Sequence, residues 1–452
     1  MLNKEALKKI LYNLEFIEEK LELLHPDMVK KVIDDLDGEA GIISHSIGFS
    51  EEGRDIYSIE LGTGDKKVFA VAGAHPDEPA GTVTLIHLAR ELVKLQRAGY
   101  CRDYKFFFIP QLDPDGASKN WEWMKKTYYY KNFLLFNFNE KNSGGRDIEC
   151  GLPVSDNQSM RPEVKAFKDF IDKNAPVDYF VTLHSDRLSG GALFLINAPV
   201  PKDIDPVMEF LTEACNKENL EMWDVERWGY SFQKRLAPGF FSHIKAEDVR
   251  NFYKDNPEEL KNVRLDTVQY AVQNCGAKFA LVTEFPFFVD REMNNHEETK
   301  ICLYDFELER IRQRRKNLAL QKELWKELND FPVTESNKKW LDFYEGFFEV
   351  RSRYLSAFRE NMDDYRGKFA TEGDLHDLYK EKMSNEYLIP LMTMRRLTGV
   401  ENEKGRNLYE TYETIFEEKL ERYEKLFLYR PLSVSRQVKL QTITILSGLL
   451  VV

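Results

Sequence analysis

Three segments of the chain carry side chains that could share one metal ion. The first, Lys67–Gly81, has the sequence KVFAVAGAHPDEPAG, a short apolar run of strand length followed by a turn that contains His75 and Glu78. The apolar spacing from Val83 to Val93 then predicts a helix. Because three positions are about one helical turn, the imidazole and the carboxylate can point at one ion.

Two later segments have a similar form. Val177–Ile196 is predicted to be a buried strand that carries His184, and Phe279–Phe288 is an apolar run that contains Glu284. A carboxylate in such a run is costly unless it is paired, hydrogen-bonded or bound to a metal. Two histidines and one glutamate that leave a fourth position open are the ligands of a catalytic zinc site, with a further carboxylate as its general base. The sequence therefore predicts one zinc ion bound by the two histidines and Glu78, with Glu284 as the base.

Together these residues resemble the zinc carboxypeptidase family. The matching motifs, in chain order, are His75-Pro-Asp-Glu78, Asp113-Pro-Asp-Gly116, Thr182-Leu-His184-Ser185 and Thr283-Glu284. Upstream, the segment Ile47–Ile56 is similar to the beginning of that family's domain, so the resemblance covers roughly residues 40 to 300. It implies an α/β fold with a mixed central sheet and helices on both faces, and it implies the zinc-dependent hydrolysis of a peptide or amide bond.

The chain departs from this family where arginines are expected. An arginine beyond the Asp-Pro-Asp-Gly turn stabilises the oxyanion in the family, and the nearest cations here are Lys125 and Lys126. Lysine supplies positive charge without the planar fork of arginine. We expect one of these two lysines to take the oxyanion role.

A second departure concerns the substrate's terminal carboxylate, which an Asn-Arg pair binds in the family. Asn137 matches the asparagine, but Phe138 stands in place of the arginine. Bidentate recognition of a carboxylate is the usual task of such an arginine. Arg146 and Arg187 are the candidates to replace it, and Tyr253 is a candidate for a substrate-binding tyrosine, as is Tyr230.

Changes in composition divide the chain into four parts. They are an N-terminal helical segment (residues 1–40), a zinc carboxypeptidase-like catalytic domain (41–300), a helical C-terminal domain (301–430) and a β-prone tail (431–452). Beyond about residue 300, glycine and proline become scarce and charged helical periodicity dominates. The tail alternates and is rich in β-branched residues, which predicts a strand.

Bulk composition excludes several classes of protein. The formal net charge of −12 argues against a general nucleic-acid binder, and no apolar run is long enough to span a membrane. The first residues show no signal-peptide pattern, and five cysteines without a C-x-x-C pair are typical of a reducing cytoplasm. We therefore expect a cytoplasmic protein that acts on a peptide or an acylated amino acid.

Two other functions remain open from the sequence. One is an N-acyl amino-acid deacylase of the aspartoacylase-like type, although that group usually has glycine where this chain has Pro76. The other is an inactive zinc-binding relative that acts as an assembly protein. In that case the helical region would form a homo-oligomer or bind a protein partner.

Overall fold

The computed structural model describes residues 4–12, 20–37, 41–125, 129–140, 146–154, 158–197, 199–225, 233–255, 257–357, 362 and 365–452. The chain forms two compact units, and each is described by itself. The first comprises Met1–Lys141, Gly145–Val289 and Pro431–Val452, and the second contains Asp290–Arg430. The first unit is therefore discontinuous, because its last 22 residues follow the second unit in the sequence.

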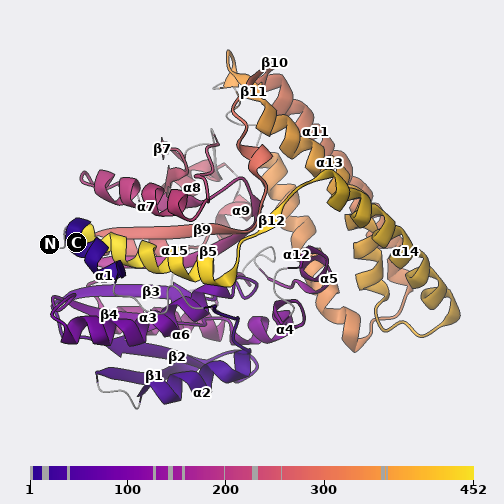
Figure 1. The fold of residues 1–452 in the computed structure, drawn as a ribbon. Coiled ribbons are helices and arrows are strands. Elements are labelled where there is room, and N and C mark those ends of the chain that lie inside the picture. The colour runs from indigo at the N-terminus through magenta and orange to yellow at the C-terminus, as the bar shows by residue number, and fades with distance from the viewer. Residues whose placement is uncertain are drawn as a thin grey trace. The chain divides into compact units, whose positions relative to one another are not determined.

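A mixed β-sheet forms the centre of the first unit (Figure 1). Its strands in spatial order are β1 (Ile42–Phe49), β2 (Asp55–Leu61), β4 (Tyr104–Ile109), β3 (Lys66–Ala72), β5 (Tyr179–Ser189), β9 (Phe279–Val289), β6 (Leu193–Ile196), β8 (Phe240–Ser242) and β7 (Arg235–Ala237). The neighbours β4, β3, β5 and β9 are parallel to one another, whereas β2 pairs with β4 and β6 pairs with β9 in the antiparallel sense. The predicted mixed sheet is confirmed.

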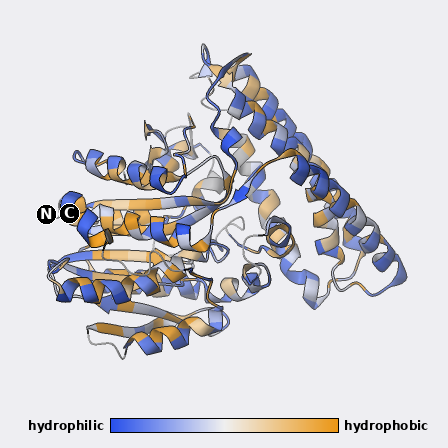
Figure 2. Ribbon diagram, in the orientation of Figure 1, coloured by the Kyte–Doolittle hydropathy of each residue, from blue (hydrophilic) through white to orange (hydrophobic). Residues whose placement is uncertain are grey.

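Helices cover both faces of this sheet. On one face, α6 (Pro162–Asn174) and α10 (Thr267–Gln273) contribute to an apolar core with inward residues of β3, β5 and β9. On the other face lie α3 (Ala80–Arg97) and α15 (Val434–Ser447). A Cβ on Gly81 of α3 would lie 2.7 Å from the Cβ of Ala72, so glycine permits the close approach of α3 to β3. The strands appear as the most hydrophobic part of this unit in Figure 2.

Further helices of the first unit lie around this framework. They are α1 (Lys4–Tyr12), α2 (Pro26–Asp37), α4 (Pro114–Met124), α5 (Tyr130–Phe136), α7 (Asp205–Lys217), α8 (Ala246–Phe252) and α9 (Pro257–Asn262). The described part of the N-terminal segment thus contains two helices, and Pro26 is the first residue of the second. Proline suits that position because the amide it lacks would have no partner within the helix.

The second unit is mainly helical, as the composition predicts. A short two-stranded sheet of β10 (Glu298–Cys302) and β11 (Phe369–Thr371) accompanies α11 (Leu303–Glu327), α12 (Glu335–Ala357), α13 (Glu372–Leu397) and α14 (Glu403–Leu426). Thr371 and Asp374 form a capping box at the start of α13. Apolar clusters pack between these helices, for example one formed by Leu328, Phe331, Leu397 and Val400. Within the described residues, no helix is long and apolar enough to cross a bilayer.

The prediction of a strand in the C-terminal tail is wrong. Val434–Ser447 forms the helix α15, and the Ser433 hydroxyl accepts a hydrogen bond from the amide of Arg436 at its beginning. Most of this helix is buried, including Val438, Ile445 and Leu446. An apolar segment that is buried on nearly all sides loses the periodicity that separates strand from helix, and tertiary packing then overrides β-propensity.

Candidate active site

The first pair of predicted ligands lies in the turn that follows β3. Gly73 leaves the strand with φ +66°, a left-handed conformation that favours glycine. The amide of Glu78 then donates to the carbonyl of His75, which closes the turn at 3.1 Å. Glu78 is buried, with 3% of its surface exposed. The turn therefore presents the imidazole and the carboxylate together, as the spacing predicts.

The third predicted ligand lies on the neighbouring strand. The pairing of β3 with β5 ends at Ala72 and Leu183, so His184 is the next residue beyond it. The backbone amide of His184 donates to the hydroxyl of Thr283 on β9 at 3.0 Å. Since the three parallel strands end at the same edge of the sheet, their side chains meet where α/β proteins commonly bind ligands.

These three residues form one compact cluster. Ligand atoms of His75, Glu78 and His184 all lie within 4.8 Å of one another. The Nδ1 atom of His75 is 3.1 Å from one carboxylate oxygen of Glu78, and the Nδ1 atom of His184 is 2.7 Å from the other. Both imidazoles therefore turn the same nitrogen toward a shared carboxylate, which suits one ion bound between them.

One acidic residue lies on the far side of each imidazole. Asp147 lies 3.6 Å from Nε2 of His75, and Glu149 lies 3.5 Å from Nε2 of His184. The hydroxyl of Thr267 donates to the second oxygen of Glu149. Metal-binding histidines commonly have a carboxylate at the nitrogen that does not face the metal, because it fixes the ring and its tautomer. The residues present thus fit a zinc ion in both their ligands and their supporting groups.

The electrostatics of the cluster also favour a cation. Burial lowers the pKa of His75, but Glu78 and Asp147 outweigh it and raise the pKa to about 10. The pKa of His184 is also raised well above its usual value, because Glu78 and Glu149 outweigh the effect of burial. The buried carboxylates therefore demand positive charge, which protons supply in the metal-free protein and a divalent ion would supply in their place.

Sequence reasoning missed Asp147 and Glu149. The sequence around them has no apolar periodicity, and only the short run Arg-Asp-Ile-Glu, in which two acids flank an isoleucine, marked them. Ile148 is buried in the main core, with 3% of its surface exposed. That burial holds the two acidic neighbours against the metal cluster.

Glu284 lies beside the metal ligands in the sheet. In the parallel pairing of β5 with β9, its Cα is the partner of His184, and on the other side it pairs with Leu193 of β6. The residue is half-buried within a strand that is otherwise almost entirely buried. The structure therefore brings the predicted base to the same edge of the sheet as the predicted ligands.

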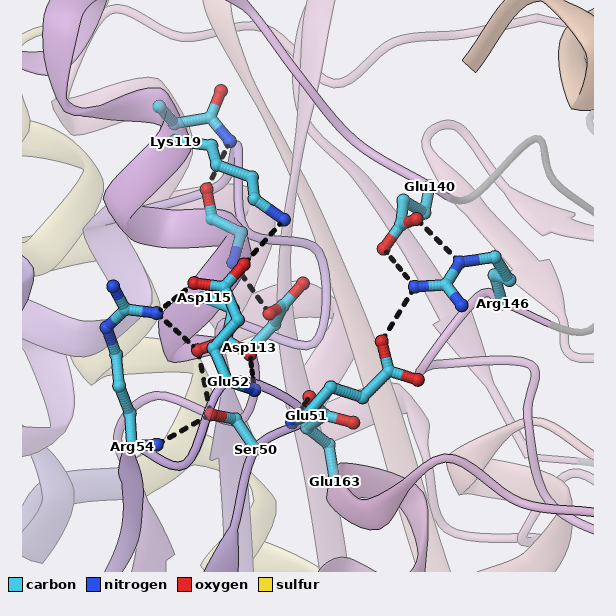
Figure 3. Close-up of polar contacts among 12 residues, drawn as sticks. Ser50, Glu51, Glu52, Arg54, Asp113, Asp115, Lys119, Glu140, Arg146 and Glu163 are labelled. Carbon is cyan, nitrogen blue, oxygen red and sulfur yellow. Dashed lines mark hydrogen bonds and ion pairs between the residues drawn. The ribbon is translucent and has the colours of Figure 1, made fainter. Parts of the chain in front are cut away.

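The Asp-Pro-Asp-Gly motif lies between the metal turn and the segment before β2. The amide of Asp113 donates to the carbonyl of Gly73 at 2.8 Å, and Figure 3 shows the contacts with the segment before β2. Asp113 accepts from the amide of Gly116 at 2.8 Å and so caps α4, while burial raises the pKa of Asp113 to about 7. Asp115 accepts from the hydroxyl of Ser50 at 2.7 Å and from Arg54 at 2.6 Å. The upstream segment Ile47–Ile56 is thus tied to this turn.

Asn137 and Arg146, the candidates for carboxylate binding, already have acidic partners. The side-chain amide of Asn137 donates to Asp77 at 2.7 Å. The guanidinium of Arg146 contacts Glu140 at 2.6 Å and Glu51 at 2.8 Å (Figure 3). Asp77 is buried in the metal turn itself, with 3% of its surface exposed.

The other predicted residues lie elsewhere or outside the described residues. Lys125 follows α4, and its ammonium group is 2.7 Å from Glu122 at the surface. Arg187 is an exposed residue of β5, and Tyr253 is half-buried after α8 with its ring against Phe252. Lys126 and Tyr230 lie outside the part of the chain that the structure describes.

Comparison with known proteins finds one family that resembles the segment with the metal ligands. Residues 30–195 match the model of the zinc carboxypeptidase family, and this range contains the three metal ligands but not Glu284. A metallo-carboxypeptidase from Burkholderia cenocepacia is similar at 17% identity over 59% of this chain and 60% of that one, with a TM-score of 0.37. A metallo-carboxypeptidase from Pseudomonas aeruginosa, solved with (2-guanidinoethylmercapto)succinic acid, is similar at 16% identity over 75% of this chain and 69% of that one, also with a TM-score of 0.37.

Both TM-scores lie below 0.5, so the similarity to the family rests on residues 30–195 rather than on these two structures. The matched range includes the turn with His75 and Glu78 and the strand with His184, which the structure brings together with a carboxylate behind each imidazole. Residues 30–195 of this chain, which contain all three predicted metal ligands, are therefore similar to the zinc carboxypeptidase family.

Proposed function

We propose that this protein hydrolyses peptide or amide bonds with one zinc ion held by His75, Glu78 and His184, and with Glu284 as general base. The observation that carries the proposal is the convergence of the three ligands within 4.8 Å beside a strand in which Glu284 is the register partner of His184. A zinc ion bound there supplies a water of lowered pKa and polarises the scissile carbonyl.

The remaining steps belong to side chains of this protein. Glu284 takes a proton from the attacking water and delivers it to the leaving amine, as a carboxylate at the edge of a metal site can do. Asp147 and Glu149 place a negative charge within 3.6 Å and 3.5 Å of Nε2 of His75 and of His184, which favours the orientation that turns Nδ1 toward Glu78. Lys125 serves the oxyanion only if it leaves Glu122, and a Lys125→Met variant with unchanged turnover would remove it from the mechanism.

The contacts of Arg146 and Asn137 bear on whether the substrate needs a free C-terminal carboxylate. Arg146 is held by Glu140 and Glu51, and Asn137 is held by Asp77, so acidic partners compete with a terminal carboxylate for both side chains. A buried acid in the metal turn also disfavours an anion nearby. We therefore expect hydrolysis that does not require a free C-terminal carboxylate.

Mass spectrometry of a mixed peptide pool tests the proposal. The pool contains each peptide with a free and with an amidated C-terminus, together with N-acyl amino acids, and it is incubated with zinc-loaded protein. The Glu284→Gln variant is the matched control, because it keeps the size of the side chain and loses its basicity. We expect cleavage of both peptide forms by the native protein and none by the variant.

Other outcomes of this experiment redirect the proposal. Removal of single C-terminal residues from free-acid peptides alone would show that some group does bind the carboxylate. Cleavage of acylated amino acids in place of peptides would indicate the deacylase function. Zinc-loaded protein that cleaves nothing in the pool would contradict the proposed activity.

A further inference from the structure

A glutamine near the end of the chain contacts the residue that follows His184. Gln437 lies in the first turns of α15, a helix that follows the entire second unit in the sequence, and none of its surface is exposed. Its amide nitrogen donates to the carbonyl of Leu432 at 3.0 Å. Its amide oxygen accepts from the hydroxyl of Ser185 at 3.5 Å.

Ser185 also contacts one of the predicted metal ligands. It follows His184 in β5, and its backbone amide donates to Glu78 at 3.2 Å. The oxygen that it contacts is the one that lies 2.7 Å from Nδ1 of His184. Gln437, Ser185 and Glu78 therefore form a continuous path of hydrogen bonds from α15 to the centre of the candidate zinc site.

The same C-terminal segment is tied to the strand of the proposed base. The amide of Leu432 donates to the carbonyl of Phe287 in β9 at 2.8 Å, three residues beyond Glu284. The carbonyl of Leu432 in turn holds Gln437. One short segment thus contacts both strands that carry the proposed chemistry, which are β5 with His184 and β9 with Glu284.

We propose that Gln437 is a positioning residue of the zinc site, which acts through Ser185 on the orientation of Glu78. The inference rests on the metal site of the proposed function but concerns the holding of the ion rather than the reaction. The pairing of β5 with β3 ends at Leu183, so the backbone of Ser185 has no neighbour there from β3. A buried amide that holds the Ser185 hydroxyl fixes this backbone and therefore the amide that contacts Glu78.

A second glutamine on α15 provides a matched control. Gln441 lies one turn further on and is equally buried, with none of its surface exposed. Its amide oxygen accepts from the hydroxyl of Thr84 on α3 at 2.7 Å, and Thr84 also donates to Ala80. Loss of either glutamine removes one buried hydrogen bond to a hydroxyl, but only Gln437 is linked to a predicted ligand.

Zinc affinity of the full-length protein, measured by competition with a chromogenic chelator at fixed pH, tests this inference. We expect Gln437→Met to weaken zinc binding by about tenfold or more, as the loss of such supporting contacts typically does. Gln441→Met should change the affinity by less than about twofold, within the scatter of independent sites. Thermal unfolding of the metal-free variants serves to show that both substitutions disturb the fold to a similar extent.

A third variant removes the other partner of the hydrogen bond between Gln437 and Ser185. Ser185→Ala removes the hydroxyl and keeps the backbone amide, so we expect a loss of zinc affinity similar to that of Gln437→Met. In the double variant the two losses should not multiply, because both remove the same path. If Gln437→Met does not fold, the zinc affinities of Ser185→Ala and Gln441→Met are enough to test the inference.

The outcomes separate this inference from the proposed function. Equal zinc affinities for the native protein, Gln437→Met and Ser185→Ala would overturn the inference, even if peptides are cleaved. A selective loss of affinity in these two variants would support it, even if no peptide is cleaved. Losses that multiply in the double variant would also overturn it, because the two residues would then act separately.

Discussion

Each unit of the molecule contains a buried cluster of acids and bases, and the two clusters are built differently. In the second unit, Asp290 is closed in by His376, whose Nε2 is 2.9 Å from the carboxylate, and by Lys380 at 2.5 Å. The ammonium and imidazole contacts outweigh burial and lower the pKa of Asp290. The negative charge of Asp290 is therefore compensated by basic groups in direct contact with it.

In the first unit, three carboxylates, those of Glu78, Asp147 and Glu149, face two imidazoles, so acids outnumber bases. Burial alone would lower the pKa values of His75 and His184, but these carboxylates raise both of them. Nε2 of His75 and one oxygen of Glu149 are buried and make no hydrogen bond within the described residues. Buried ionisable groups with shifted pKa values and unsatisfied hydrogen-bonding atoms are typical of functional sites. Buried ion pairs whose partners contact each other directly are typical of structural clusters. The difference distinguishes a binding site from a structural cluster.

The largest expected effect comes from Glu284. If the first cluster serves catalysis, Glu284→Gln should lower turnover by roughly 10³-fold, because a positioned general base contributes about that much. Zinc affinity should stay close to that of the native protein, because Glu284 is not one of the three ligands. Steady-state kinetics and zinc stoichiometry measure the two quantities on one preparation. Full turnover in the variant would end the assignment of the base.

The second cluster should respond in stability rather than in metal binding. Lys380→Met removes a buried partner of Asp290, and we expect a loss of about 3 kcal/mol in the free energy of unfolding. Arg312→Met is the control in the same unit, because its pair with Glu309 is exposed and contributes less than about 1 kcal/mol. Urea denaturation of each variant gives these values. A loss of zinc affinity in Lys380→Met would contradict the division between the clusters.

The pH dependence of stability should separate metal-free from zinc-loaded protein. Because the folded protein raises the pKa of His75 from 6.5 to about 10, its stabilising contribution is complete below 6.5 and is lost as the pH rises through 10. We expect metal-free protein to lose about 5 kcal/mol of stability toward alkaline pH, at about 1.4 kcal/mol for each unit of the change in pKa. Zinc-loaded protein should lack this slope, since the ion replaces the protons. Parallel slopes in urea denaturation would show that the imidazoles are not the ligands.

The smallest effect is expected at Arg146. Because Glu140 and Glu51 already engage this half-exposed guanidinium, Arg146→Ala should change the KM for free-acid peptides by less than about twofold. Amidated peptides of the same sequence are the control. A selective tenfold rise in KM for the free acids would instead make Arg146 the missing carboxylate-binding residue.

Local patterns were enough to select residues that the structure brings together. The sequence has an apolar run before His75, another before His184 and a third that contains Glu284, and the mixed sheet places these three residues near one another. The same patterns failed for the C-terminal segment. Its β-branched residues predict a strand, yet burial on nearly all sides makes it the helix α15.

The sequence by itself determined the types of the predicted ligands, their order along the chain and their association with buried strands, because these features depend on neighbours in sequence. Only the tertiary structure decided that Asp147 and Glu149 lie behind the imidazoles, that acids engage Arg146, and that Gln437 contacts Ser185 beside His184. The contact of Gln437 with Ser185 joins residues 252 positions apart. Periodicity carries no information at such separations, since these contacts follow from how the helices pack on the sheet.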